Sequence, residues 1–343
     1  MTNPLTGKTI LLTGGTGSFG QKFVEIVLQK YDPRSIRVYS RGEFLQWQME
    51  QKFNSHPKLR FFIGDVRDKA RLSRAATDVD IIIHAAALKQ VPTCEYNPIE
   101  AVRTNIEGTA NIINTAINAE VNKVIFISSD KAVQPVNLYG ATKLVAEKLV
   151  IQANSYTGGK GTIFSCTRYG NVAFSRGSVI PLWEEQKNGV NLLITDKRAT
   201  RFWLTLQDGV QFVIDSLDKM QGGEIFMPKI PSVRVLELAE IVAPNSQKKV
   251  IGLRPGEKLH EILLNRDEAR HSLEFESYYV INPEFPFWKT RESTGAVLPE
   301  GFEYASDTNK SWISKEKLRG IIEEWRTKLQ EPVLSAEKTN QSN

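Results

Sequence analysis

Short apolar runs alternate with helix-spaced apolar positions through the first half of the chain. The runs have the length of strands, and the segments between them place apolar side chains three and four positions apart. This alternation predicts an α/β fold with a parallel sheet, helices on both faces and right-handed crossovers. The expected strands are Thr9–Thr13, Ile36–Ser40, Arg60–Ile63, Ile81–His84, Val124–Ser128 and Thr162–Arg168, and the expected helices are Gly20–Gln29, Phe44–Phe53, Ala70–Ala75, Ile99–Ala119 and Leu138–Ala153.

The pattern changes after Gly170, where Pro, Gly and Arg become frequent and the elements shorten. A strand over Glu224–Met227 and a helix over Val235–Val242 indicate a smaller lobe interwoven with the last part of the sheet. From about Glu284 the chain is rich in Pro, Ser and charge, with one amphipathic helix over Ser314–Leu329. The expected divisions are a sheet domain over 1–170, a mainly substrate-binding mixed α/β lobe over 171–283, an extension over 284–330 and a disordered tail over 331–343.

Composition adds bounds on the class of protein. The 343 residues are 41% apolar and 24% charged with a net charge of +5, as in an ordinary soluble globular protein. The scattered basic residues suit an anionic phosphorylated small molecule as well as nucleic acid, and we expect no nucleic-acid partner. Cys94 and Cys166 cannot form a disulfide framework or a metal cluster. Without a signal peptide or an apolar run of about 18 residues, we expect a cytoplasmic protein with no membrane segment.

A glycine-rich loop follows the first strand and opens the first helix. Glycines there permit a tight turn and a close backbone approach to a pyrophosphate, which rests on the positive helix N-terminus. A glycine-rich turn without a ligand is the alternative, but strand, loop, helix and next strand all fall where a dinucleotide site needs them. The chain is therefore expected to have a doubly wound, Rossmann-type sheet. The loop residues expected at the cofactor are Gly14, Thr16, Gly17, Ser18, Phe19 and Gly20.

The end of the second strand bears on which dinucleotide binds. An acidic residue there would accept hydrogen bonds from the ribose 2′-hydroxyl of NAD. This chain has Ser40, which can donate to a 2′-phosphate, and Arg41, which can pair with it. NADP is therefore favoured, although Glu43 leaves NAD open. Three further positions at strand ends are expected to border the cofactor: Asp65, Val66 and Ala86.

Tyr139 and Lys143 lie one helical turn apart, just after the fifth strand. The pKa of a free phenol is about 10, and we expect Lys143 and the positive nicotinamide to lower it toward neutrality. Tyr139 could then take the proton from a substrate hydroxyl while hydride leaves the same carbon. Lys143 would also bind the nicotinamide ribose, and Ser129 is placed to hold the substrate hydroxyl.

Asp130 and Lys131 add acid–base chemistry at the same strand end. Once a sugar hydroxyl has become a ketone, the proton on the neighbouring carbon is acidic. A base can remove that proton, and an acid can protonate the next hydroxyl so that water departs. A carboxyl group and an amine side by side supply such a pair. A surface ion pair at a helix N-terminus is the alternative, and the residues alone leave both open.

These motifs resemble those of the extended short-chain dehydrogenase/reductase superfamily. In detail they are similar to those of the inverting UDP-N-acetylglucosamine 4,6-dehydratases, which start pseudaminic acid synthesis for flagellin or surface glycans. Related capsule enzymes often have Met at the position of Tyr139, and some are longer. Tyr139 and the short chain therefore favour the pseudaminic acid branch. Ser129, where some relatives have Thr, still offers a hydroxyl. The resemblance runs from about Lys8 to Tyr279 and is carried by Arg41, Gly64–Asp68, His84–Lys89, Ser129–Ala132, Asn137–Lys143, Arg168–Asn171, Arg201–Trp203 and Leu253–His260.

The resemblance implies a mechanism and a cofactor. Tightly held NADP⁺ would oxidise carbon 4 of the sugar with Tyr139 as base and be regenerated in each turnover. Lys131 would remove the carbon 5 proton, and Asp130 would protonate the departing oxygen on carbon 6. Carbon 5 would be reprotonated on the opposite face. The remaining residues implied at the sugar, the diphosphate or the uridine ribose of UDP-N-acetylglucosamine are Lys89, Asn171, Arg201, Arg254 and Glu257, with no metal. Lys89 and Tyr139 are also expected at the cofactor.

Two other functions stay open. A nucleotide-sugar 4-epimerase shares the fold, the cofactor and the Tyr/Lys pair, but needs no equivalent of Asp130 and Lys131. A non-catalytic NADP-binding scaffold shares the fold alone, and the intact Tyr139 and Lys143 argue against it. The resemblance also implies a homo-oligomer, between a dimer and a hexamer.

Overall fold

The computed structural model describes residues 3–157, 161–175, 177–187, 189, 191–288 and 294–330, and the side chains of 328–330 are not described. The tail expected over 331–343 lies outside these residues. The first half of the chain contains β1 (Thr9–Thr13), α1 (Ser18–Lys30), β2 (Ser35–Ser40), α2 (Glu43–Lys52), β3 (Leu59–Ile63), α3 (Lys69–Ala76), β4 (Ile81–His84), α4 (Val91–Tyr96), α5 (Pro98–Val102), α6 (Gly108–Asn118), β5 (Lys123–Ile127), α7 (Leu138–Gln152) and β6 (Ile163–Thr167).

The second half has shorter elements, as expected, apart from two long helices. It contains β7 (Asn171–Val172), α8 (Val179–Gln186), β8 (Asn191–Ile194), β9 (Thr200–Leu204), α9 (Leu206–Lys219), β10 (Ile225–Pro228), β11 (Ser232–Arg234), α10 (Val235–Val242), β12 (Gln247–Val250), β13 (Ile262–Leu264), α11 (Arg266–Ala269), β14 (Ser272–Glu274), β15 (Tyr278–Ile281), β16 (Ala296–Val297), β17 (Tyr304–Ala305) and α12 (Lys315–Gln330).

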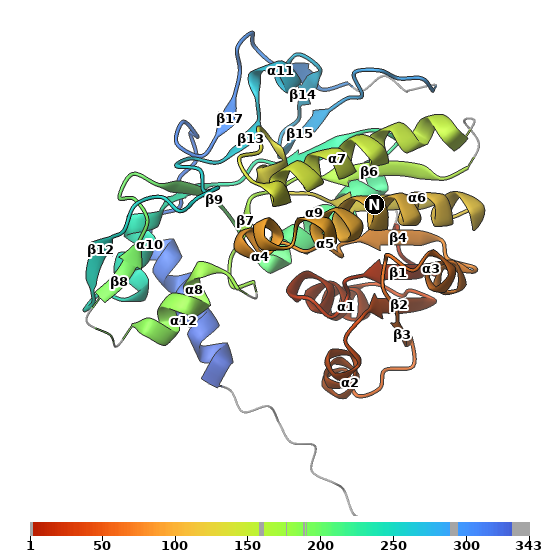
Figure 1. Cartoon of the computed structure of the whole chain (residues 1–343), viewed down its shortest axis with the longest axis horizontal. Coiled ribbons are helices and arrows are strands. Elements are labelled where there is room, and N and C mark those ends of the chain that lie inside the picture. The colour runs from red at the N-terminus through yellow and green to blue at the C-terminus, as the bar shows by residue number, and fades with distance from the viewer. Residues whose placement is uncertain are drawn as a thin grey trace, which may run out of the picture.

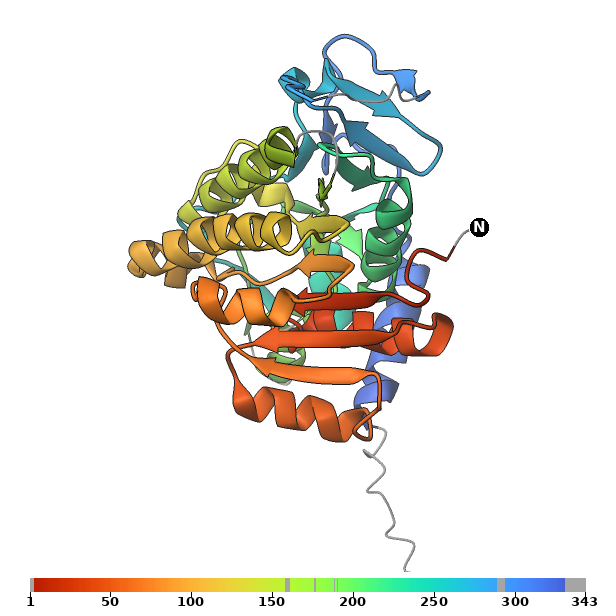
Figure 2. The same cartoon turned by 90° about the vertical axis from the view of Figure 1, so that its right-hand side faces the viewer.

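Within the described residues, ten strands form one large sheet in the order β16-β14-β15-β10-β6-β5-β4-β1-β2-β3. The run from β10 to β3 is parallel, and β15, β14 and β16 extend it with antiparallel pairs. Helices cover both faces of the parallel part, and β1, β4 and β5 are buried along nearly their whole length (Figures 1 and 2). The expected doubly wound parallel sheet is confirmed.

The helix expected over Ile99–Ala119 is interrupted. Between α5 and α6 the chain forms a π-helical turn over Arg103–Glu107. This turn carries Asn105, whose side-chain amide donates to the Leu88 carbonyl at 2.9 Å and to the Thr142 hydroxyl at 2.9 Å. The wider turn thus ties the loop after β4 to α7, and such π-turns often occur next to functional sites.

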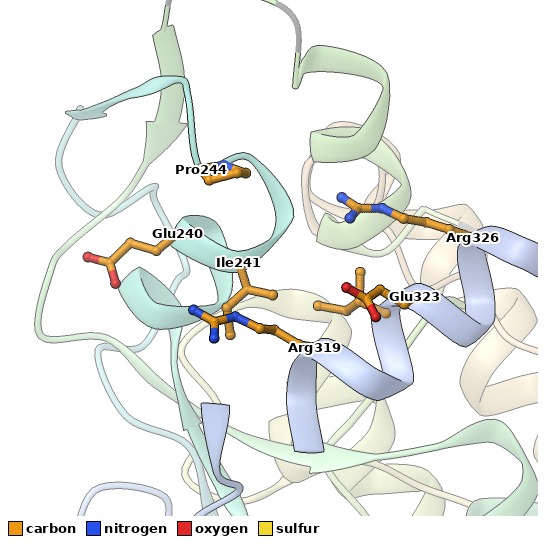
Figure 3. A pocket seen from close by; sticks show the side chains of 7 residues that line it. Glu240, Ile241, Pro244, Arg319, Glu323 and Arg326 are labelled. Atoms are coloured by element: carbon orange, nitrogen blue, oxygen red, sulfur yellow. The ribbon is translucent and has the colours of Figure 1, made fainter. Parts of the chain in front are cut away.

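In the described ranges, three smaller sheets accompany the large sheet, and α8, α10 and α12 share a second, smaller apolar core. β11, β9 and β7 form one sheet, β12 pairs with β8, and β13 pairs with β17. α12 packs on α10 and α8, where an open pocket of about 230 Å³ is lined by Glu240, Arg319 and Arg326 among others (Figure 3). This pocket contains none of the predicted site residues. Among the helices that the structure describes, none is long and apolar enough to span a membrane.

Candidate active site

The predicted catalytic residues lie where β5 ends and α7 begins. After β5 the chain forms a short 3₁₀ turn over Asp130–Ala132, and the Asn137 side chain caps α7 by accepting from the backbone of Gly140 at 2.8 Å. Gly140 lets α7 approach this turn closely, because a Cβ at that position would overlap the Lys131 carbonyl oxygen. The glycine and the cap therefore bring the turn and the first residues of α7 together.

Asp130 is fully buried at the centre of this cluster. Its Oδ1 accepts from the Ser129 hydroxyl at 2.7 Å and from Lys131 Nζ at 3.0 Å. Its Oδ2 is also buried and has no hydrogen-bond partner among the described residues. A buried carboxylate oxygen without a partner costs free energy, so Oδ2 is available to a group that enters the site.

Lys131 bridges two carboxylates. Its Nζ lies 3.0 Å from Asp130 Oδ1 and 3.5 Å from Glu261 Oε1, at the residue just before β13. Burial alone would lower the pKa of Lys131, but attraction to Asp130 and then to Glu261 outweighs burial and raises the pKa above its usual range. Lys131 is therefore an ammonium at neutral pH in the free protein, and it must give up a proton before it can act as a base.

Burial has the largest influence on the pKa values of Tyr139 and Lys143. Burial raises the pKa of Tyr139 to about 12, although Lys131 and the Ser129 hydroxyl lower it in part. Lys143 instead donates to the Ile127 carbonyl at 2.5 Å and lies 4.2 Å from the centre of the Phe126 ring. Burial lowers the pKa of Lys143 to about 8. Burial therefore dominates the pKa of both groups in the free protein, and the expectation that Lys143 and the positive nicotinamide together lower the pKa of Tyr139 stays a prediction for the cofactor-bound protein.

The glycine loop fits a dinucleotide pyrophosphate. Gly14 has a φ of +67°, and a Cβ there would lie 2.9 Å from the backbone of Ala86. α1 begins after Gly17, where no side chain among the described residues forms a cap and the first turn holds no acidic residue. The positive end of this helix favours an anion, and no acidic side chain in its first turn opposes one. The predicted loop residues Thr16, Ser18, Phe19 and Gly20 all lie in this turn or in the first turn of α1.

The ends of β2 and β3 place the other predicted cofactor residues together. Arg41 lies 3.9 Å from Asp65, and its side chain is 57% exposed, so the guanidinium can reach a phosphate at the surface. Ser40 accepts from the Gln46 amide at 3.0 Å, which leaves its own hydrogen for another acceptor. Asp65 is held mainly by Arg67, at 2.7 Å. Val66 is buried.

The residues expected at the substrate lie on several elements. Arg201, on β9, pairs with Glu257 at 2.8 Å and lies 3.7 Å from Glu261 Oε1. It thereby joins the cluster around Lys131. Glu257 also accepts from the Thr195 hydroxyl at 3.0 Å. Three further residues are exposed: Lys89 in the loop after β4, Asn171 at the start of β7 and Arg254 after β12. The substrate roles of all five residues stay predictions.

Sequence reasoning missed two members of the site, Glu261 and Asn105. Glu261 directly follows the Leu253–His260 motif, and this position is the only feature of the sequence that points to a place in the site. Its side chain is buried, and burial raises its pKa. Asn105 lies within a segment that reads as an ordinary amphipathic helix, and only the π-turn shows that it faces the loop after β4.

A glycine loop at the first strand end and a Tyr/Lys pair on the helix after the fifth strand define an extended short-chain dehydrogenase/reductase. The model of one family, described as polysaccharide biosynthesis protein, matches residues 10–283. The chain belongs to this family.

Three similar proteins show where the chain lies within the family. The inverting UDP-N-acetylglucosamine 4,6-dehydratase of Campylobacter jejuni subsp. jejuni is 49% identical over 92% of this chain and 97% of that protein. The UDP-glucose 4-epimerase of Rickettsia rickettsii is 43% identical over 80% of this chain and 82% of that protein. The X-ray structure of Pen from Bacillus thuringiensis has a TM-score of 0.84 and 39% identity, and covers 93% of this chain and 99% of that one. The resemblance seen in the sequence is confirmed.

Proposed function

We propose that this protein is an inverting UDP-N-acetylglucosamine 4,6-dehydratase, a hydro-lyase that uses NADP. The observation that carries the proposal is the contact between Lys131 and the buried Asp130, beside Tyr139 at the end of β5. A dehydration next to a ketone needs one base and one acid at neighbouring carbons. The 49% identical relative of that name supports the same function.

The glycine loop, Ser40, Arg41 and Lys143 would hold the dinucleotide. Bound there, the nicotinamide supplies a hydride acceptor for carbon 4 and a hydride donor for carbon 6, so the reaction has no net redox change. Lys143 is placed to bind the ribose, since its Nζ lies at the end of β5. With a pKa lowered to about 8, it remains largely protonated at neutral pH and can donate hydrogen bonds.

The protein residues move the protons. Tyr139 accepts the proton of the carbon 4 hydroxyl as the ketone forms, so it must first lose its own proton, and a positive ring nearby favours that loss. Transfer of one proton from Lys131 Nζ to Asp130, which are 3.0 Å apart, produces a neutral amine and a carboxylic acid together. Lys131 can then take the carbon 5 proton while Asp130 protonates the carbon 6 oxygen.

The proton count closes over one turnover. The carbon 4 hydroxyl and carbon 5 each release one proton, while the departing water and the reprotonated carbon 5 each take one up. The proton that Tyr139 took from the carbon 4 hydroxyl is the one left for carbon 5, and its delivery from the opposite face gives UDP-2-acetamido-2,6-dideoxy-β-L-arabino-hex-4-ulose and returns Tyr139 to its ionised form. Lys131 ends the cycle protonated and Asp130 ionised, which is the ion pair of the free protein.

A 4-epimerase is the second candidate, and the 43% identical Rickettsia rickettsii relative favours it. An epimerase returns hydride to carbon 4 and releases no water. Asp130 and Lys131 would then have no reaction step, although they occupy the centre of the cluster. The two functions therefore differ in whether a methyl group appears at carbon 6.

The deciding experiment incubates the purified protein with UDP-N-acetylglucosamine and no added reductant, followed by proton NMR. A new methyl signal with the configuration inverted at carbon 5 supports the dehydratase, and a change at carbon 4 alone supports the epimerase. Substrate carrying deuterium at carbon 4 should deliver it to the new methyl group. If the methyl group forms without that deuterium, the internal hydride return is disproved.

We predict that Arg41→Ala weakens NADP binding and leaves NAD binding nearly unchanged. A charged hydrogen bond to phosphate contributes about 1.5–3 kcal/mol, so the loss for NADP should be about ten- to a hundredfold in Kd. Titration calorimetry with each dinucleotide measures it. Arg270→Ala is the control, because Arg270 is an exposed arginine whose ion pair is with Asp267. Equal losses for both dinucleotides would show that Arg41 does not read the 2′-phosphate.

The wider setting follows the same proposal. We place the reaction at the start of pseudaminic acid synthesis, with the product destined for flagellin glycosylation, in a cytoplasmic homo-oligomer. The resemblance of the motifs supports this setting, and UDP-N-acetylglucosamine is the substrate named for the 49% identical relative. Light scattering of the full chain in solution measures the number of subunits. A monomer with full dehydratase activity would contradict the oligomer.

A further inference from the structure

Glu261 is a buried carboxylate to which the proposed mechanism gives no role. Its side chain lies beside the catalytic pair, with Oε1 3.5 Å from Lys131 Nζ and 3.7 Å from Arg201 Nε. Its Oε2 is buried and has no hydrogen-bond partner among the described residues. A buried acid that leaves one oxygen unpaired costs stability, so its presence beside Lys131 calls for a function.

The backbone of Glu261 is fixed by a segment far along the chain. Its N–H donates to the Ser306 hydroxyl at 2.9 Å, and its carbonyl accepts from the Ser306 N–H at 2.8 Å. The Ser306 hydroxyl also lies 2.7 Å from the Thr200 hydroxyl. Ser306 directly follows β17, which pairs with β13, so this pairing sets the position of Glu261. The segment after residue 284 thus supports the active site.

Four charged groups face the Glu261 side chain. Asp130 and Lys131 lie on the turn after β5, Arg201 on β9 and Lys258 on the loop before β13. Lys131 therefore contacts two carboxylates, Asp130 in its own turn and Glu261 at the residue before β13. With Asp130 alone, the flexible Lys131 side chain would have one anchor and more freedom to leave the site.

We propose that Glu261 is a positioning residue that holds Lys131 at carbon 5 of the sugar and strengthens it as the base of the elimination. This rests on the proposed dehydratase function. In that step Lys131 takes the carbon 5 proton, the C–H electron pair becomes the carbon 5–carbon 6 double bond, and the carbon 6–oxygen bond breaks as Asp130 supplies a proton to the departing water. Glu261 takes no part in these bond changes and acts through its contact with Lys131.

The test compares Glu261→Gln with the wild type in a single turnover of UDP-N-acetylglucosamine. Loss of the negative charge should slow elimination by about ten- to a hundredfold, part of what a general base contributes. Hydride removal at carbon 4 depends on Tyr139 and should be unchanged. Reduced nicotinamide should therefore accumulate in the variant, visible by its absorbance, while the methyl signal appears late. Glu274→Gln, at an exposed carboxylate paired with Lys229, is the matched control.

Each outcome separates the two proposals. A wild type that forms no methyl group disproves the dehydratase function itself. An active wild type with a Glu261→Gln variant of equal rate, or with both steps slowed equally and no accumulation, overturns the positioning role. Glu261→Asp keeps the charge but draws it back by one methylene group, and it should show a smaller accumulation. If thermal melting shows that Glu261→Gln is not folded, the test uses Glu261→Asp instead. Wild-type kinetics in Glu261→Asp would then overturn the proposal.

Discussion

Replacing Lys131 by alanine should abolish the 4-keto-6-deoxy product and leave the dinucleotide bound. Lys131 follows β5 and lies 3.0 Å from Asp130, whereas the glycine loop follows β1 and Arg41 follows β2, so the change leaves these cofactor residues in place. Loss of a general base costs about 10²–10⁴ in rate, and here the acid also loses the proton that Lys131 would give it. The methyl signal in proton NMR measures the rate, and release of the nucleotide from denatured protein measures its occupancy.

The Lys131→Ala variant should still exchange hydride with carbon 4, since Tyr139 is intact. Reduced nicotinamide should therefore build up and persist, with a larger amplitude than in the Glu261→Gln variant. Lys229→Ala removes a partly buried lysine outside the site, which pairs with Glu274 at 2.7 Å, and serves as the control. Full dehydration by Lys131→Ala would remove Lys131 from the mechanism and leave the site without its base.

The first half of the fold was predictable because its signals are local. β1 and β4 have the expected bounds, β2 and β3 begin one residue earlier than expected, and β5 and β6 differ by one residue at each end. Each of these strands is a short apolar run, and the parallel sheet follows from their alternation with helices. The glycine loop was equally readable, since the positive φ of Gly14 and its close approach to Ala86 are demands that glycine meets.

The rest depended on contacts between residues far apart in sequence. Glu261 and Lys131 are far apart in sequence, and the β13–β17 pairing that fixes Glu261 involves strands of two or three residues. Strands so short leave no periodic pattern. The charge states were hidden for a related reason. Spacing showed that Tyr139 and Lys143 share a helix face, but burial raised the pKa of one and lowered that of the other.

Replacing Arg168 by alanine should destabilise the protein more than any surface change. Arg168 is fully buried just after β6, and its guanidinium donates to Glu147 at 2.6 and 2.9 Å, to Glu268 at 2.9 Å twice and to the Leu263 carbonyl at 3.0 Å. These contacts use all five N–H donors. Alanine would leave the buried Glu147 uncompensated, which costs about 3–5 kcal/mol.

The site should weaken together with the fold, because Arg168 joins α7 to α11. Glu147 lies one turn after Lys143 on α7, while Glu268 lies on α11, shortly after β13. A loss of about 3–5 kcal/mol is a large part of the usual stability of a domain, so urea unfolding should show a much lower midpoint. Arg168→Lys keeps the charge but cannot form the same paired hydrogen bonds, so its urea midpoint should lie between those of the wild type and Arg168→Ala. Arg270→Ala, from an exposed pair with Asp267, should change the free energy of unfolding by less than about 1 kcal/mol. A similarly small change for Arg168→Ala would mean that the buried pairs contribute little to holding α7 against α11.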